Sequence, residues 1–333
     1  MKKINLKISV LLCVFNGEKW IKDSVNSILN QTFQEFEFII INDGSTDNTR
    51  EILENYEYQN PKIRLINQAN VGLTASLNYG LTIAKGKWIA RIDSDDISFP
   101  QRLEKQYIYA ERTNSSLVGC QAKFVSDNNQ GISTYKVPND HRNLVNNLVH
   151  QKIFFAHSSA FFKKESALKV GNYRKVMRKS QDYDLWLRIS EIGTISCINY
   201  FGVLIRVHKD RISSKNFGLN QRIYAHCANI SYLIRQEKIN ISDPCNTTKK
   251  KEMENFINFV SDELIKHSFL DFYVKLFKYK NNESASKNFL HKFFDIFKNF
   301  NNFKLIIILI RWIIFGDYIS KIIKNKWLSN KYK

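Results

Sequence analysis

The stretch Lys87-Trp88-Ile89-Ala90-Arg91-Ile92-Asp93-Ser94-Asp95-Asp96 indicates the fold class of this chain more clearly than any other segment. Its apolar first half has the length and composition of a short buried β-strand. Its second half places a cluster of carboxylates where that strand runs into a loop. Such carboxylates repel one another and ionise most easily beside a cation. A divalent metal ion held by oxygen ligands is therefore the expected counter-ion.

A second junction of this kind lies upstream, where Phe38-Ile39-Ile40-Ile41 runs into Asn42-Asp43-Gly44-Ser45-Thr46-Asp47. In an open α/β sheet, ligands bind outside the carboxyl ends of the strands. We therefore expect the two acidic loops to face one ligand. Taken alone, Asn42-Asp43-Gly44 is equally typical of a simple turn.

Strand-like and helix-like patterns alternate over residues 1–110. The expected strands cover residues 8–14, 36–41, 63–67 and 88–92, and the expected helices cover 20–30, 46–56 and 74–84. This order predicts a mostly parallel sheet with right-handed crossovers, flanked by helices. Further strand-like runs follow less regularly at 117–125, 153–162, 195–198 and 203–207.

Glycine is distributed unevenly along the 333 residues, since eleven of the twelve glycines lie before residue 219. The chain is long enough for one sizeable core and a smaller second unit. We therefore expect an α/β domain over residues 1–215 and a mainly helical, basic region over 216–333.

The formal net charge of +19 favours a polyanionic partner, either nucleic acid or anionic lipid headgroups. Compositional drift is the alternative, because lysine, asparagine and isoleucine are abundant throughout. The sequence has no helix-turn-helix, zinc-finger or RNA-binding signature, and carboxylates at strand ends repel a phosphate backbone. We therefore expect no nucleic-acid partner, although a non-enzymatic nucleic-acid-binding protein is kept as an alternative.

The most apolar segment, residues 305–315, contains Arg311 near its centre. As a helix it spans roughly 16 Å, well short of a hydrocarbon core of about 30 Å. Lysines and aromatic residues flank it, which is typical of a helix lying at an anionic membrane surface. We expect such an interface helix within residues 303–328. A helix packed on the catalytic domain is the alternative.

The five cysteines are scattered and lack metal-binding spacing, so they predict reduced, mostly buried thiols in a cytosolic protein. The apolar run over residues 8–15 ends without a small-residue cleavage site. We expect a first β-strand there rather than a signal peptide.

The combined motifs closely resemble glycosyltransferase family 2. The matching segments, in order, are residues 8–18, 42–47, 70–72, 84–96, 171–174, 181–188 and 206–208. Each motif alone is weak, but their co-occurrence in the right order over about residues 6–215 is a strong signal. The resemblance implies the GT-A nucleotide-diphospho-sugar transferase fold, which is Rossmann-like, with transfer of a sugar and inversion at the anomeric carbon.

The resemblance places a nucleotide-sugar donor, with UDP as the favoured nucleotide, at the acidic loops. Asp43 is expected to accept a hydrogen bond from the pyrimidine ring, and Asp93 to contact the ribose or the metal shell. The complete set of expected donor contacts is Val14, Phe15, Asn16, Glu18, Asp43, Asn70, Gly72, Arg91, Asp93 and Ser94.

A metal ion, Mn²⁺ or Mg²⁺, is expected because the diphosphate leaving group develops negative charge. Asp95 is the leading ligand. By resemblance, His208 approaches the metal or the diphosphate, although a lone histidine is often only structural. Asp96 has an alternative interpretation as a helix N-cap.

The acceptor hydroxyl must lose a proton, and Asp182 is the expected general base. It matches the aspartate of the family's Glu-Asp pair, but Gln181 replaces the glutamate and puts that residue's role in acceptor binding in doubt. Asp184 is the rival base. His157 resembles a position that lines the acceptor side.

The sequence thus predicts an inverting, metal-dependent glycosyltransferase. The expected acceptor is a glycan or lipid-linked saccharide in cell-surface polysaccharide synthesis, such as lipopolysaccharide or capsule, at the cytoplasmic face of the membrane. No Gln-x-x-Arg-Trp motif follows Asp182, so we expect one sugar per encounter. The alternative enzyme is a sugar-phosphate nucleotidyltransferase. That enzyme would carry a glycine-rich phosphate loop where this chain has Cys13-Val14-Phe15-Asn16-Gly17-Glu18.

Overall fold

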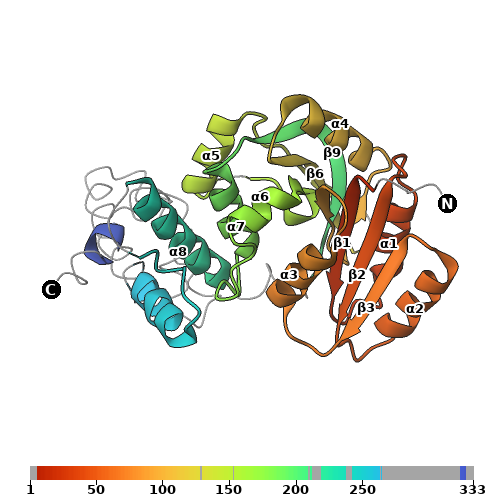
Figure 1. The fold of residues 1–333 in the computed structure, drawn as a ribbon, viewed down its shortest axis with the longest axis horizontal. Coiled ribbons are helices and arrows are strands. Elements are labelled where there is room, and N and C mark those ends of the chain that lie inside the picture. Colours follow the sequence, from red (N-terminus) through yellow and green to blue (C-terminus); the bar gives the residue numbers. More distant parts are fainter. Residues whose placement is uncertain are drawn as a thin grey trace, which may run out of the picture. The chain divides into compact units, whose positions relative to one another are not determined.

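The computed structural model describes residues 6–127, 130–152, 154–208, 211, 219–237, 242–262, 264 and 323–327. The chain divides into two compact units, one formed by residues 1–148 and 153–214 and the other by 149–152 and 215–333 (Figure 1). The assignment of catalysis to residues 1–215 and of a separate region to 216–333 stays a prediction.

The first unit begins with a parallel sheet. Its strands are β1 (Ile8–Val14), β2 (Phe36–Asp43), β3 (Ile63–Gln68) and β4 (Trp88–Arg91). β1 pairs in parallel with both β2 and β4, and β2 pairs with β3. Every residue of β1, β2 and β4 is buried. A sheet covered on both faces buries both sides of its strands, which explains their nearly continuous apolar sequences.

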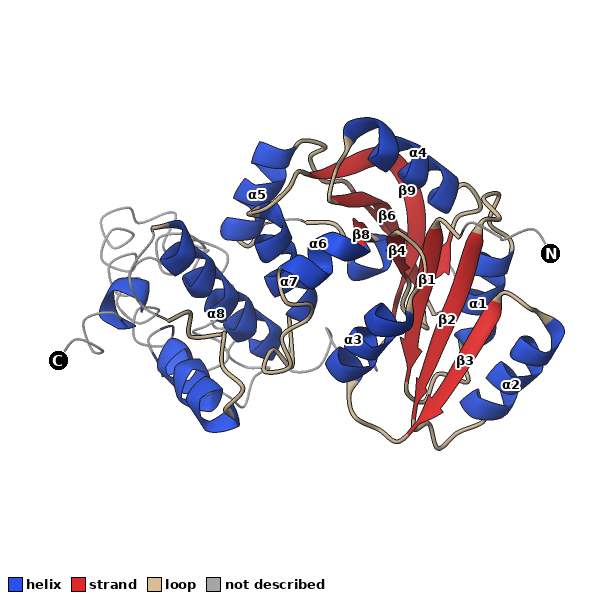
Figure 2. Cartoon of the chain, viewed as in Figure 1, coloured by secondary structure: helices blue, strands red, loops and turns tan. Residues whose placement is uncertain are grey.

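Three helices connect these strands: α1 (Ile21–Leu29), α2 (Thr49–Gln59) and α3 (Leu73–Ile83). The chain moves outward from β1 to β3 and then returns across β1 to β4. Right-handed crossovers therefore place α1 and α2 on one face and α3 on the other, as Figure 2 shows. The reversal of strand order beside β1 creates the switch point at which ligands bind in such sheets.

The sheet continues beyond β4 with mixed pairing. The further strands are β5 (Ile97–Ser98), β6 (Leu117–Ser126), β7 (Gly131–Tyr135), β8 (Phe161–Lys163) and β9 (Ile195–Val207). The strand order is β3-β2-β1-β4-β8-β6-β9-β5, with β7 paired to β6. β6 and β9 are parallel, whereas β8 is antiparallel to both β4 and β6. The remaining helices of this part are α4 (Arg102–Thr113), α5 (His141–Val149), α6 (Lys164–Lys169) and α7 (Gln181–Ser190).

The expected strand over residues 153–162 is wrong. The structure has a 3-10 turn at His157–Ser159 and a strand only from Phe161. The Ser159 hydroxyl donates to the Ala156 carbonyl at 2.8 Å, and the Ser158 hydroxyl contacts carboxylates of the β4 loop. Serine hydroxyls that bond locally compete with a strand ladder in this way.

Two other expected boundaries also differ. Residues 195–198 and 203–207 belong to the single strand β9. The strand continues through residues 199–202, where its register against β6 shifts. α2 starts at Thr49 rather than Thr46, because the Asp47 carboxylate accepts the Thr49 amide at 3.1 Å and Glu18 accepts the Asn48 amide at 2.9 Å. These carboxylates satisfy the first donors of the helix.

The second unit contains α8 (Leu219–Gln236) and further helical residues at 250–262 and 323–327. The Trp327 ring packs on Phe256 and Phe259, with centroids 4.8 and 5.0 Å away. All five cysteines are buried and outside disulfides, as expected. Among the residues described, no helix is both long and apolar enough to cross a bilayer. The expected interface helix at 303–328 lies outside the described residues apart from 323–327.

Candidate active site

The carboxyl ends of three adjacent strands bring the expected donor residues together. β1 lies between β2 and β4, so the loops that follow Val14, Asp43 and Arg91 leave the sheet at the same edge. This edge holds both acidic loops that the sequence singled out.

Asp43, only 4% exposed, organises the loop that follows β3. Its Oδ1 accepts the side-chain amide of Gln68 at 2.8 Å and the Val71 backbone N–H at 2.9 Å, and its Oδ2 accepts the Gly72 N–H at 2.8 Å. A carboxylate offers about four lone-pair sites. Three donors therefore leave room for one more, which a base N–H of a nucleotide can fill.

The loops after β1 and β2 are hydrogen-bonded to each other. The Asn16 backbone N–H donates to the Ser45 hydroxyl at 2.9 Å, and the Asn16 side-chain oxygen accepts the Thr46 backbone N–H at 2.8 Å. Asn16 is left-handed, with φ of 53°, which asparagine tolerates better than most residues. The Glu18 carboxylate accepts two hydrogen bonds from Asn48, just before α2, and these bonds join the two loops.

Two apolar side chains remain exposed on these loops. Phe15, which follows β1, is 51% exposed, and Val71, which is held by Asp43, is 59% exposed. Exposed apolar side chains beside a buried acceptor are suited to a flat heterocycle, whose faces are apolar and whose edge donates hydrogen bonds.

The β4 loop contains an ion pair between a buried arginine and a partly exposed aspartate. Arg91 is fully buried, and its guanidinium lies 2.5 Å from Asp93 Oδ1. Burial raises the pKa of Asp93, but Arg91, His157 and the Ser158 hydroxyl outweigh it and hold the pKa below its usual range. Asp93 is therefore an anion whose position is fixed.

Asp96 behaves in the opposite way to Asp93. It is 3% exposed, and burial together with repulsion from Asp95 and Asp93 raises its pKa well above the usual range. The Ser158 oxygen lies 2.5 Å from Asp96 Oδ2 and 2.8 Å from Asp93 Oδ2. One hydroxyl has one proton to give, so a protonated Asp96 supplies the second. The alternative of a helix N-cap for Asp96 is wrong, because strand β5 follows it.

Asp95 of the β4 loop contacts His208, the residue that follows β9. Asp95 Oδ2 and His208 Nε2 are 2.9 Å apart, and their side chains are 25% and 8% exposed. Ligands about 2.1 Å from an octahedral ion and at right angles to each other are about 3 Å apart, so the pair fits two adjacent ligand positions. The described residues contain no group of three or more such side chains that could hold a metal ion.

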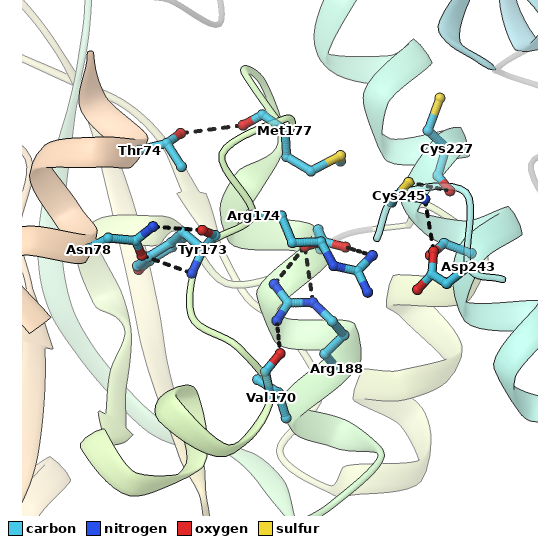
Figure 3. Close-up of polar contacts among 12 residues, drawn as sticks. Thr74, Asn78, Val170, Tyr173, Arg174, Met177, Arg188, Cys227, Asp243 and Cys245 are labelled. Carbon is cyan, nitrogen blue, oxygen red and sulfur yellow. Dashed lines mark hydrogen bonds and ion pairs between the residues drawn. The ribbon is translucent and has the colours of Figure 1, made fainter. Parts of the chain in front are cut away.

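The two carboxylates at the start of α7 have different surroundings. Asp184 is 1% exposed and accepts hydrogen bonds from Arg188 at 2.6 and 3.1 Å and from Arg174 at 3.3 Å. Arg188 also donates to the Val170 carbonyl at 2.6 Å (Figure 3). Asp182 is half-buried, and no hydrogen bond or ion pair holds its carboxylate within the described part of the chain. Asp184 is committed to arginines, whereas Asp182 is available.

His157 and Tyr173 link this side of the site to the β4 loop. Asn78 on α3 holds Tyr173 through both backbone groups, at 2.7 and 3.0 Å (Figure 3), and the Tyr173 hydroxyl lies 3.0 Å from His157 Nε2. Burial, followed by Arg91, lowers the pKa of His157 to about 4, while Asp182 and Asp93 act in the opposite direction. The pKa of His157 is therefore raised by the charges of both Asp93 and Asp182, against the larger effect of burial.

Sequence reasoning missed two residues of this arrangement. Ser158 joins Asp93 to Asp96, and Trp20 packs on His208 with ring centroids 4.3 Å apart. A single serine carries no sequence signal for such a contact. Trp20 lies two residues beyond the matched segment that ends at Glu18, so no matched motif marked it.

The family description "Glycosyl transferase family 2" matches residues 9–171. The chain is 35% identical over 253 residues to the O-antigen biosynthesis glycosyltransferase WbnJ of Escherichia coli, which covers 75% of this chain and 92% of that protein. It is 29% identical over 320 residues to an uncharacterized glycosyltransferase of Haemophilus influenzae, covering 87% of this chain and 98% of the relative.

Solved structures agree with the fold. The S. aureus TarS 1–349 structure with UDP-GlcNAc superposes with a TM-score of 0.57 at 17% identity, covering 75% of this chain and 70% of that one. The structure of the same protein with UDP gives a TM-score of 0.55 at 17% identity, covering 78% and 71%. Likeness at this identity concerns the fold alone, and it confirms the expected GT-A architecture with a helical C-terminal part. Together with the relatives that match nearly along their whole length, these findings lead to one conclusion: the chain is a glycosyltransferase and belongs to glycosyltransferase family 2.

Proposed function

We propose that this glycosyltransferase moves a sugar, with inversion, from a UDP-linked donor to a hydroxyl of a glycan or lipid-linked saccharide. The similarity to WbnJ, which is named for O-antigen biosynthesis, supports a role in bacterial cell-surface polysaccharide synthesis. The TarS structures with UDP and UDP-GlcNAc support the choice of donor. The proposed place of action is the cytoplasmic face of the membrane.

The observation that carries this proposal is the shared environment of His157. His157 Nε2 lies 3.0 Å from the Tyr173 hydroxyl, and the hydroxyl of the adjacent Ser158 lies 2.8 Å from Asp93 Oδ2. Arg91 and Asp93 on the donor side and Asp182 on the acceptor side are among the charges that act on the pKa of His157. Electrostatic effects of this kind need short separations in a partly buried site. An ionised Asp93 on the donor side and the Asp182 carboxylate on the acceptor side of the same site, to which no described residue donates a hydrogen bond, suit a displacement reaction.

On the donor side, each residue has a definite part. Asp43 accepts the base N–H with its remaining lone pair, and Phe15 and Val71 cover the base. Asp93, kept ionised by Arg91, accepts a ribose hydroxyl. Val14, Asn70 and Ser94 complete the walls, while Asn16 and Glu18 hold the loops in place through hydrogen bonds to Ser45, Thr46 and Asn48.

Asp95 and His208 are the residues that would hold a divalent cation. Such an ion supplies positive charge beside the diphosphate leaving group. Because the pair offers one oxygen and one nitrogen, it suits Mn²⁺ better than Mg²⁺, which prefers oxygen. Two protein ligands are enough when the substrate phosphates and water fill the remaining positions.

On the acceptor side, Asp182 takes the proton of the attacking hydroxyl. The acceptor oxygen forms a bond to the anomeric carbon as the bond from that carbon to the phosphate oxygen breaks, and UDP departs. A single displacement of this kind inverts the anomeric configuration. Asp184 holds Arg174 and Arg188 and so fixes the helix that presents Asp182.

The test combines product analysis with a base variant. The protein is incubated with a panel of sugar nucleotides, Mn²⁺ and candidate acceptors. Release of nucleoside diphosphate supports transfer, whereas formation of pyrophosphate would identify the nucleotidyltransferase alternative. Asp182→Asn should lower turnover by about 100-fold or more and leave UDP affinity unchanged.

Asp184→Asn is the matched control for the base assignment. It should lower thermal stability, because the buried Arg188 and the partly buried Arg174 lose a carboxylate that they contact. Any loss of turnover should follow the loss of folded protein. Near-normal turnover in Asp182→Asn would reject the assignment. Tight, salt-sensitive nucleic-acid binding with indifference to sugar nucleotides would overturn the whole proposal.

A further inference from the structure

Trp20, the residue before α1, lies against the imidazole of His208. The two ring centroids are 4.3 Å apart with an interplanar angle of 46°, and Trp20 is only 9% exposed. His208 lies just beyond the last residue of β9, Val207, so strand pairing does not fix it. The contact with the indole is therefore one restraint on where this imidazole lies, beside the 2.9 Å contact between His208 Nε2 and Asp95 Oδ2.

The indole is itself held by cations. The Arg206 guanidinium lies 5.3 Å from the ring centroid of Trp20, and Lys19 Nζ lies 4.1 Å from it. Cations over an indole at such distances are attracted to its face. The Trp20 ring is thus in contact with both of these cations and with the His208 ring.

Arg206 ties this arrangement to the acidic loop. It is 2% exposed, its backbone N–H donates to Asp96 Oδ1 at 3.0 Å, and its Nε donates to the Asp95 carbonyl at 3.1 Å. It also pairs with Asp23 of α1 at 3.0 Å. The segment that bears Asp95 and the helix that follows Trp20 are therefore joined through one side chain.

We propose that Trp20 is a positioning residue that holds His208 against Asp95, so that both ligands are in place before a divalent cation arrives. The proposal rests on the cation role of Asp95 and His208 given above. A ring confined before binding loses less conformational freedom on binding, which raises affinity without a new contact. Groups that orient metal ligands commonly change affinity by about 10- to 100-fold when removed.

The test measures Mn²⁺ affinity directly, by the electron paramagnetic resonance signal of the unbound ion, for the full chain without donor. Trp20→Ala should bind Mn²⁺ about tenfold more weakly than the unchanged protein, while Trp20→Phe, which keeps an aromatic face, should stay within about threefold. Tyr58→Ala removes an aromatic side chain that is 91% exposed and serves as the matched control. It should leave the affinity unchanged.

A double-mutant comparison separates positioning from general damage. If Trp20 acts through His208, Trp20→Ala should have no further effect on Mn²⁺ affinity in a His208→Ala background. Equal effects of Trp20→Ala in both backgrounds would overturn the proposal, as would an unchanged affinity in Trp20→Ala alone. Thermal midpoints of all variants show that the folded protein is compared.

A second measurement needs no metal and keeps the two proposals distinguishable. In the metal-free protein, the ring current of Trp20 should shift the His208 ring protons in a histidine-selective NMR spectrum. That shift should vanish in Trp20→Ala and persist in Trp20→Phe. Absence of Mn²⁺ binding by the unchanged protein, with the NMR shift present, would refute the cation role and with it the purpose proposed for Trp20, while leaving the ring contact itself established. An unshifted His208 signal would refute the positioning by Trp20 alone.

Discussion

The two acidic loops at the switch point look alike in sequence and differ in how their charge is balanced. At the end of β2, a single carboxylate, that of Asp43, is surrounded by N–H donors from Gln68, Val71 and Gly72. At the end of β4, the carboxylates have an arginine, a serine and a histidine as partners. The first loop is held by neutral donors and is built to be rigid. The second balances full charges, and its balance can change when a ligand binds.

Removal of Asp95 should have the largest effect on activity. Asp95→Asn should lower transfer by about a thousandfold, because about 4 kcal/mol of charge stabilisation at the diphosphate is lost. Its thermal midpoint should change little, since Asp95 is partly exposed. Turnover and Mn²⁺ binding are measured together. Normal Mn²⁺ affinity in this variant would show that the β4 loop is not the cation site.

The second-largest effect is expected from removing the Asp43 carboxylate, which holds the loop after β3. Asp43→Ala should lower the free energy of unfolding by about 2 kcal/mol, because three partly buried N–H donors lose their acceptor. UDP affinity should fall as well. Urea denaturation and calorimetric titration with UDP provide the measurements. Glu51→Ala, an exposed acidic residue in the first turn of α2, is the control and should be near neutral.

A smaller effect, confined to stability, should follow from Gly44, which tests the rigidity of the β2 loop. It has φ of 77°, and a Cβ there would lie 2.6 Å from the Asn70 backbone nitrogen. Gly44→Ala should cost about 2 kcal/mol from strain and close contact. Gly72→Ala, with φ of 89° but open space around the Cβ, should cost less. Gly131→Ala has neither problem and should be neutral in the same urea experiment.

The smallest effect concerns the pH dependence of stability that His157 causes. The pKa of His157 is lowered to about 4 by burial and then by Arg91, so the unfolded chain binds more protons than the folded one between about pH 4 and pH 6.5. Stability should therefore rise with pH across this window and be fully present above it. His157→Gln should lack that rise. Denaturation midpoints at pH 5 and pH 7.5 compare the two proteins, and an equal rise in both would exclude His157 as its source.

The sequence was sufficient for the parts of the fold that depend on local pattern. Continuous apolar runs predicted the buried parallel strands, and the acidic residues at their ends marked the switch point. The GT-A fold expected from the motifs is confirmed. The roles of the individual site residues stay predictions, because no ligand contact tests them.

What sequence reasoning did not supply depends on which side chains meet in the folded chain. The availability of Asp182 and the commitment of Asp184 differ only because Arg174 and Arg188 reach Asp184. The 3-10 turn at His157–Ser159 replaced an expected strand because Asp93 and Asp96 engage the Ser158 hydroxyl. The partners of Ser158 lie more than 60 residues away along the chain and are not visible in a local pattern. Arg188, in contrast, follows Asp184 by one helical turn on α7, so that ion pair could have been expected from the sequence.

That turn has a mechanical consequence. Ser158 holds Asp93 and Asp96 on one side, while its immediate neighbour His157 contacts Tyr173 and lies within the field of Asp182 on the other. The carboxylate contacts of Ser158 and the tyrosine contact of His157 are therefore joined through a single peptide unit. One short turn, His157–Ser159, thus holds both sets of contacts in place.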